Sequence, residues 1–160
     1  MAQQIQVCDV QPTLVTLPHC KNTIDTQHFK TGTVFVRACA LKLEGNWQKH
    51  GSYIELLESA TFKVSGECQL KGGEDPYVGH FVVGLAKHHN MGKVKTELSP
   101  PDEENEEDFT NHLPGIMTPI ALGLCDDEYV KFSLTSAEPY WKMQKGLIIY
   151  GVTFTPMEMV

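Results

Sequence analysis

The feature that most restricts the fold of this chain is a series of short apolar stretches separated by turn-forming residues. Residues 61–70 alternate between apolar and polar side chains, the pattern of a half-exposed antiparallel strand. Residues 147–155 are rich in β-branched and aromatic residues and form the most β-prone stretch of the chain. No stretch has the period of a long amphipathic helix. The sequence therefore predicts an all-β protein.

The spacing of these stretches favours an antiparallel β-sandwich or jelly roll of about seven to nine strands. A small barrel would give a similar pattern. Residues 53–57 are ambiguous between a strand and one helical turn. The expected strands are residues 33–43, 53–57, 61–70, 77–86, 93–98, 116–124, 129–135 and 147–155.

The whole chain, residues 1–160, is expected to form one β-sandwich domain, since its length suits a single hydrophobic core. Residues 1–30 are interpreted as an extended N-terminal segment, either an edge strand or an arm. Residues 99–115 are interpreted as an acidic loop. Pro100 and Pro101 argue against a strand at its start, and a single helical turn is the alternative.

Charge and hydropathy limit the partners and the location of the chain. A net charge of −7 argues against nucleic-acid binding, because bulk attraction to phosphates needs the opposite sign. No apolar run approaches the ~20 residues that span a bilayer, so we expect no membrane insertion. The N-terminus has no signal-peptide pattern. These features are compatible with a cytosolic protein, a virion component or an extracellular fragment.

The five cysteines do not form the dense, even set of a disulfide scaffold. Cys39 and Cys68 lie within expected strands, where a thiol acts as a small apolar side chain. We expect mostly free thiols, with one bridge between Cys8 and Cys20 left open.

No motif in the sequence indicates catalysis, a cofactor or a metal. There is no GxSxG element and no phosphate-binding glycine loop. No cysteine lies in a context that would lower its pKa. The seven histidines do not have the spacing of a zinc site, and the acidic run lacks the central glycine of an EF-hand. We therefore expect a protein that is not an enzyme and has no catalytic, cofactor-binding or metal-binding residues.

One acidic cluster could contact a basic partner. Two interpretations of it stay open: a solvated loop that maintains solubility, and a contact for a basic protein such as a histone. The cluster consists of Asp102, Glu103, Glu104, Glu106, Glu107 and Asp108.

Aromatic residues in expected connections are either lids on the core or anchors of an interface. Trp47, Tyr140 and Trp141 are of this kind. The candidate interface residues are Phe35, Tyr77, Tyr140, Trp141, Tyr150 and Phe154.

Several stretches resemble the jelly rolls of tumour-necrosis-factor-like proteins. Residues 52–70 are similar to the central strand pair of that family, and residues 119–124, 129–134 and 146–152 are similar to its last three strands. The resemblance covers about half of the chain, and viral jelly rolls would give the same pattern. It implies a compact trimer with aromatic and aliphatic residues at the threefold contact and loops that face a receptor.

Three functions are compatible with this interpretation. The first is a TNF-like or spike-head-like trimer that recognises a protein receptor. The second is a viral structural protein, such as a capsid, decoration or cement subunit, whose N-terminal arm binds its neighbours. The third is an acidic, nucleoplasmin-like histone chaperone. In all three the partners are proteins, including other copies of this chain.

Overall fold

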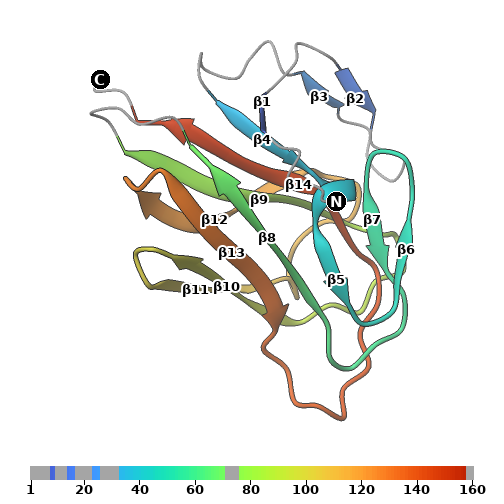
Figure 1. Ribbon diagram of the computed structural model, residues 1–160. Helices are drawn as coiled ribbons and strands as arrows, with labels where there is room; N and C mark the ends of the chain where they lie inside the picture. The colour runs from blue at the N-terminus through green and yellow to red at the C-terminus, as the bar shows by residue number, and fades with distance from the viewer. Residues whose placement is uncertain (1–7, 10–13, 17–22, 26–32, 71–75, 158–160) are drawn as a thin grey trace.

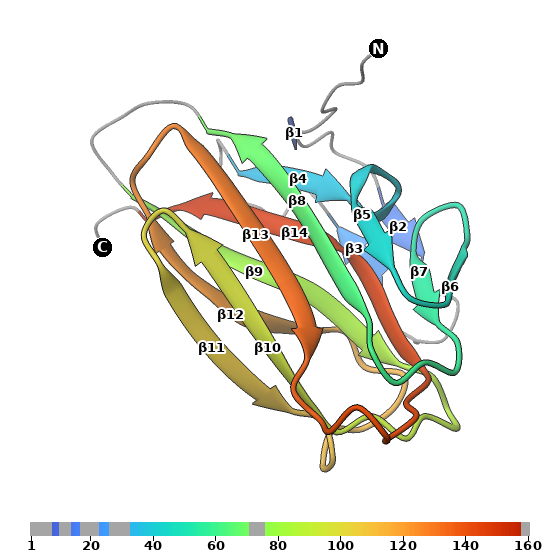
Figure 2. The ribbon, with the colours of Figure 1, turned by 60° about the horizontal axis from the view of Figure 1, so that its bottom comes forward.

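The computed structural model describes residues 8–9, 14–16, 23–25, 33–70 and 76–157. Within them, two antiparallel sheets face each other as a β-sandwich (Figures 1 and 2). The strands are β1 (Cys8–Asp9), β2 (Leu14–Thr16), β3 (Thr23–Asp25), β4 (Val34–Arg37), β5 (Lys42–Glu44), β6 (Trp47–Lys49), β7 (Ile54–Leu56), β8 (Lys63–Gln69), β9 (Tyr77–Leu85), β10 (Lys93–Ser99), β11 (Glu103–Asp108), β12 (Thr118–Cys125), β13 (Tyr129–Ser136) and β14 (Leu147–Pro156). The predicted fold class is confirmed.

The first sheet is built around β14. In the described residues it has seven strands: β14 pairs with β9 on one side and with β4 and β7 on the other, and β12, β1 and β6 extend it outward. The second sheet has five strands in the order β11-β10-β13-β8-β5. A separate pair joins β2 and β3. Because β14 has partners on both sides, it is the best-covered strand, and residues 147–154 are all buried.

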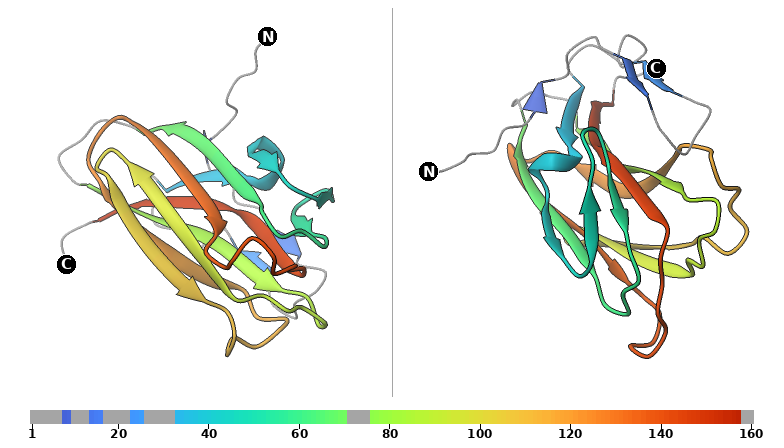
Figure 3. Two further views of the ribbon diagram at one scale, coloured as in Figure 1. Left: turned by 90° about the horizontal axis from the view of Figure 1, so that it is seen from below. Right: turned by 90° about the vertical axis from the view of Figure 1, so that its right-hand side faces the viewer.

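Alternation along the five-stranded sheet places one face of each strand in the core. Val130, Phe132 and Leu134 of β13 are buried, whereas Lys131 between them is exposed. The Phe132 ring packs against Phe81 and Phe154 of the opposite sheet, with centroids 5.8 and 5.7 Å apart. These aromatic contacts join the two layers seen in Figure 3.

The predicted strand at residues 33–43 is two strands in different sheets. The chain forms β4 in the first sheet, turns through a 3-10 helix (Ala38–Ala40) and enters the second sheet as β5. Both strands carry apolar side chains on their inner sides. The apolar pattern of the sequence therefore continues through the 3-10 helix and does not show where one strand ends and the next begins. This division, together with the additional strand described next, raises the number of strands above the predicted range.

The acidic segment is a strand in the structure, which corrects the prediction of a loop over residues 99–115. Residues 103–108 form β11, which pairs along its length with β10. Lys95 forms ion pairs with Glu97 at 3.4 Å and with Glu104 of β11 at 3.5 Å. The alternation of the strand places Glu104 on the outer face and Asn105 on the inner side, so a run of like charges is tolerated at a solvated edge.

Side chains on the inner side of β10 and β11 form hydrogen bonds with the backbone of β12, which lies at an edge of the first sheet. Thr96 donates a hydrogen bond to the carbonyl of Ala121 at 2.8 Å, and Asn105 donates one to the carbonyl of Leu122 at 3.3 Å. Glu103 accepts a hydrogen bond from the backbone N–H of Leu124 at 3.1 Å. These side chains tie the two sheets together along one edge, where β12 has backbone groups to satisfy.

Most of the expected N-terminal segment lies outside the described residues. Only β1, β2 and β3 of residues 1–30 are described, and Cys20 of the suggested Cys8–Cys20 bridge is not. Residues 71–75, between the expected strands at 61–70 and 77–86, also lie outside the described residues. Cys39, Cys68 and Cys125 are free thiols. No helix in the described ranges has the length and hydropathy to cross a membrane.

Candidate functional site at the loop end

Four loops meet at one end of the sandwich. They follow β7, β9, β11 and β13 and comprise residues 57–62, 86–92, 109–117 and 137–146. The loop between β13 and β14 projects farthest, at the lower end of the view in Figure 1 and in the right-hand view of Figure 3. This loop, residues 137–146, is called the aromatic loop below.

The base of the aromatic loop is fixed by Gln144, which is fully buried. Its backbone exchanges two hydrogen bonds with Ser59, both 2.9 Å long. Its side-chain amide donates to the hydroxyl of Ser136 at 2.8 Å and accepts from the backbone N–H of Gly92 at 3.1 Å. Through its backbone and its side chain together, this one residue ties the aromatic loop to two neighbouring loops and to the end of β13.

Further hydrogen bonds hold both arms of the aromatic loop. Asn90 accepts from the backbone N–H of Lys145 at 2.7 Å and donates to the carbonyl of Met143 at 3.1 Å. On the other arm, Glu138 accepts from the backbone N–H of Lys93 at 2.7 Å. Lys142 forms an ion pair with Glu138 at 3.7 Å, and its backbone closes a turn on Pro139.

Gly146 ends the aromatic loop in a conformation that suits glycine. Its φ is +94°, and a Cβ at this position would meet the Cβ of His89. The backbone N–H of Ala86 donates to the carbonyl of Gly146 at 2.8 Å. The absence of a side chain therefore lets two loops approach closely at this point.

Two aromatic side chains stand at the tip of this fixed loop. Tyr140 is 76% exposed and Trp141 is 71% exposed. Their rings form an edge-to-face pair with centroids 5.2 Å apart and an interplanar angle of 81°. Exposed rings on a restrained backbone are ready to stack on a ligand with little loss of conformational entropy.

A histidine pair lies beside the base of the aromatic loop. His89 accepts a hydrogen bond on Nδ1 from the backbone N–H of Met91 at 3.1 Å, which requires an unprotonated Nδ1. Burial lowers the pKa of His89, and the nearby charge of His112 lowers it further. His112 in turn contacts the Glu107 carboxylate at 2.9 Å.

The aromatic residues expected at an interface fall into two groups. The side chains of Phe35, Tyr77, Tyr150 and Phe154 are buried in the chain and have almost no surface to offer a partner. Tyr140 and Trp141 are exposed side by side. Trp47 covers the core: it packs edge-to-face on Phe62 at 5.8 Å.

The acidic residues expected to contact a basic partner belong to the β10–β11 edge. Glu103 and Glu107 have hydrogen-bond partners on neighbouring segments, and Glu104 is paired with Lys95. Asp108 accepts hydrogen bonds from the backbone and hydroxyl of Thr110, which lower its pKa. Asp102 accepts a hydrogen bond from Ser99 at 3.0 Å, and Glu106 lies opposite Lys95 across the β-ladder.

Polar side chains that fix the aromatic loop were not anticipated from the sequence. Gln144, Asn90, Ser136 and Glu138 have no motif, and their roles depend on loops far apart in the chain. Among the residues that the structure describes, no group of three His, Cys, Asp or Glu side chains could hold a metal ion.

The strand arrangement and the loops at this end define the chain as a jelly-roll β-sandwich with a restrained aromatic loop. No protein-family model and no curated protein matches the chain. Solved structures do share its fold. A GH26-CBM35 β-(1,4)-mannanase from Podospora anserina is similar with a TM-score of 0.55 and 15% identity, over 82% of this chain and 29% of that chain. The present chain thus spans less than a third of that protein and matches its carbohydrate-binding module.

A second similar structure is the C-terminal CBM6 of LamC, a marine laminarinase from Zobellia galactanivorans. It has a TM-score of 0.50 and 14% identity, over 77% of this chain and 98% of that module. At these identities the likeness concerns the fold.

These neighbours correct the functions expected from the sequence. A jelly-roll fold is supported, but the resemblance to TNF-like proteins is not. The structures that share the fold are carbohydrate-binding modules, which contradicts the receptor-binding trimer, the viral structural protein and the histone chaperone, together with the oligomer and protein partners they required. Most of the acidic residues assigned to the chaperone contact, residues 103–108, form a paired strand.

Proposed function

We propose that this chain is a non-catalytic carbohydrate-binding module that binds a saccharide at the aromatic loop. The observation that carries the proposal is the exposed pair Tyr140 and Trp141 on a loop whose base is fixed by Gln144. The jelly-roll fold shared with two carbohydrate-binding modules supports the same function.

The chemistry of sugars matches such a loop. One face of a pyranose ring presents C–H groups, and an aromatic ring that covers it removes apolar surface of both partners from water. Hydroxyl groups at the rim of the sugar need polar partners. Glu138, Lys142 and Asn90 lie at the base of the same loop and supply acceptors and donors.

Removal of either ring should weaken binding without unfolding the protein, because both rings are exposed. Covering an aromatic side chain is worth about 1.5–3 kcal/mol, so Trp141→Ala should raise the Kd about 10-fold to 100-fold. Tyr140→Ala should act in the same direction. Affinity electrophoresis against soluble mannan and laminarin, the polymers suggested by the neighbouring enzymes, followed by calorimetry, measures the effect.

Met157→Ala is the matched control, since it truncates an exposed apolar side chain in a different part of the structure. It should leave the affinity unchanged. Equal affinity of the wild type and Trp141→Ala for every saccharide bound would contradict the assignment of the site.

A further inference from the structure

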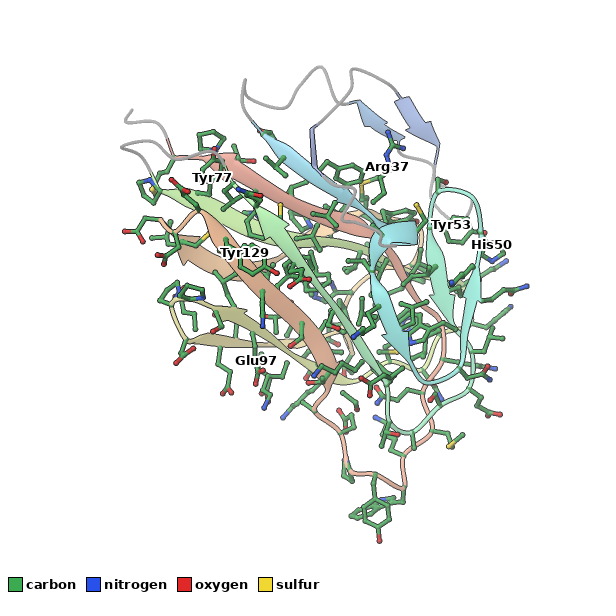
Figure 4. All side chains as sticks on the ribbon, viewed as in Figure 1. Arg37, His50, Tyr53, Tyr77, Glu97 and Tyr129 are labelled. Atoms are coloured by element: carbon green, nitrogen blue, oxygen red, sulfur yellow. The ribbon has the colours of Figure 1, made fainter. Side chains whose placement is uncertain are left out.

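The loop end also holds most of the exposed apolar surface of the described chain. Nine large apolar side chains of the described residues are exposed, and six of them lie in the four loops, which hold only 32 of the 128 described residues. The six are Leu57, Leu113, Ile116, Tyr140, Trp141 and Met143. Figure 4 shows the side chains of the aromatic loop extending beyond the sandwich, at the end away from Tyr77. Exposed apolar side chains gathered in one region indicate an interaction surface.

The loop of residues 109–117, called the apolar loop below, has no Asp, Glu, Lys or Arg side chain. Its first residue, Phe109, is fully buried, and the His112 ring packs edge-to-face on it with centroids 5.0 Å apart. Beyond this anchor, Leu113 is 67% exposed and Ile116 is 44% exposed. Neither aliphatic side chain offers a flat ring to a pyranose, so saccharide binding at the aromatic loop does not explain their exposure.

Backbone hydrogen bonds join the bases of these loops in a row. Gly115 of the apolar loop donates its N–H to the carbonyl of Leu85 at 3.2 Å. The next residue of that segment, Ala86, donates to the carbonyl of Gly146 in the aromatic loop at 2.8 Å, and Gly146 donates to the carbonyl of Leu56 at 2.8 Å. The exposed apolar side chains thus belong to neighbouring segments at one end of the sandwich.

The charge of the loop end differs in sign from that of the chain. The four loops contain three lysines and two glutamates, a formal charge of +1 with histidine neutral, whereas the whole chain has −7. Lys142 pairs with Glu138 at 3.7 Å. Lys87 and Lys145 form no ion pair within the described part of the chain, and both line a hollow of about 320 Å³ that Glu58 also lines. An anionic surface would therefore attract this end and repel the rest of the molecule.

The shape of the loop end favours a partner without a fixed surface. The apolar side chains project from loops, and the hollow between these loops is lined by charged side chains and backbone. A folded protein would need pockets that match each projecting side chain, whereas a lipid interface has no such requirement. Tryptophan and tyrosine rings suit the headgroup level of a bilayer, and lysine extends its ammonium group to the headgroups.

We propose that the loop end docks on an anionic lipid surface, with Leu113, Ile116 and the rings of the aromatic loop in the headgroup region. Lys87 and Lys145 face the anionic headgroups, where each positive charge near the surface adds to the attraction. The contact is interfacial and needs no segment that crosses the bilayer. It needs no saccharide either, and its aliphatic residues lie outside the aromatic loop.

Co-sedimentation with lipid vesicles tests this proposal. We expect the protein to bind vesicles of phosphatidylcholine and phosphatidylserine more tightly than vesicles of phosphatidylcholine alone, and to bind less tightly at 200 than at 20 mM NaCl because salt screens exposed charges. Leu113→Ala/Ile116→Ala should lower the partition coefficient on the anionic vesicles at least 10-fold, since two apolar side chains are truncated. Lys87→Gln/Lys145→Gln should reduce the preference for anionic vesicles.

Leu124→Ala/Met157→Ala is the matched control, because it truncates two exposed apolar side chains outside the four loops. It should bind anionic vesicles as the wild type does. The proposal is overturned if the wild type does not bind anionic vesicles at millimolar lipid, if Leu113→Ala/Ile116→Ala binds them as tightly as the wild type, or if the control loses as much binding.

Brominated phosphatidylcholine mixed into the anionic vesicles locates the contact, since it quenches only those indole rings that reach the lipid. We expect quenching in the wild type and none in Trp141→Phe, which keeps an apolar ring on the loop and retains Trp47 as an emitter. Equal quenching in both proteins would contradict the orientation. These vesicles carry no saccharide, and Leu113→Ala/Ile116→Ala should keep the saccharide affinity of the wild type, so failure here is distinguishable from failure of the proposed function.

Discussion

At the scale of single residues, the aromatic loop depends most on Gln144. Its amide is fully buried and has partners on Ser136 and Gly92, while its backbone pairs with Ser59. A buried amide left without partners costs free energy, so each contact favours this one arrangement of the loops. The exposure of Tyr140 and Trp141 is thus a consequence of polar packing beneath them.

His89 makes the stability of the loop end depend on pH. Its pKa is lowered in the folded chain, chiefly by burial, so its neutral form is favoured on folding. The contribution to stability is fully present above the unfolded pKa of about 6.5 and is lost as pH falls through the lowered folded pKa. The pKa of His80 is also lowered by burial, and His80 contributes in the same direction.

We therefore expect the Tm to fall as pH decreases from 7 to 5, and to fall less in His89→Gln. Differential scanning calorimetry at both pH values measures the slope of Tm against pH for the wild type and for the variant. His88→Gln, which changes the exposed neighbour, should follow the wild type. Identical slopes in the wild type and His89→Gln would show that the ring does not carry the effect.

At the scale of elements, the edge formed by β10, β11 and β12 joins the two sheets through side chains. Thr96 is buried and donates to the carbonyl of Ala121 across the sandwich. Asn105 and Glu103 of the acidic strand extend this contact along β12. The acidic strand thus has a structural role on its inner side and a solvated face on its outer side.

Thr96→Val keeps the shape of the side chain and removes its hydroxyl. We expect a loss of about 1 kcal/mol in the free energy of unfolding, because the hydrogen bond from the buried Thr96 side chain to the Ala121 carbonyl is lost. Urea denaturation of the wild type and the variant measures this loss in the free energy of unfolding. Thr135→Val, on the outer face of the neighbouring strand, should change stability much less, and an equal loss in both variants would argue against the inter-sheet hydrogen bond.

The sequence predicted the elements whose pattern is local, and missed those that depend on distant partners. Alternation in β8 and β13 identified their inner faces. The acidic run was misinterpreted as a loop because its β-propensity is low, and only pairing with β10 makes it a strand. Tyr140 and Trp141 could be identified as aromatics in a connection, but their exposure was not predictable, since it depends on Gln144, Asn90 and Glu138 from different loops.

At the scale of the whole molecule, the sandwich has two surfaces that differ from the rest of its exposed area. The aromatic loop stands at one end, and a hollow of about 510 Å³ lined by Lys42, Lys63 and Lys131 lies on the outer face of the five-stranded sheet. The two surfaces differ in chemistry, since one is aromatic and the other is cationic with serine hydroxyls.

The central claim, that a saccharide binds at the aromatic loop, is tested most directly by the indole N–H signals of the two tryptophans. Trp141 is exposed on this loop, whereas Trp47 is half-buried against Phe62 and donates its indole N–H to the carbonyl of Glu44 at 2.9 Å. In a ¹⁵N–¹H NMR titration with oligosaccharides of mannan and laminarin, we predict that the Trp141 signal shifts with saturation and the Trp47 signal stays in place. A Trp141 signal that does not move while backbone amides elsewhere respond to the saccharide would contradict the claim.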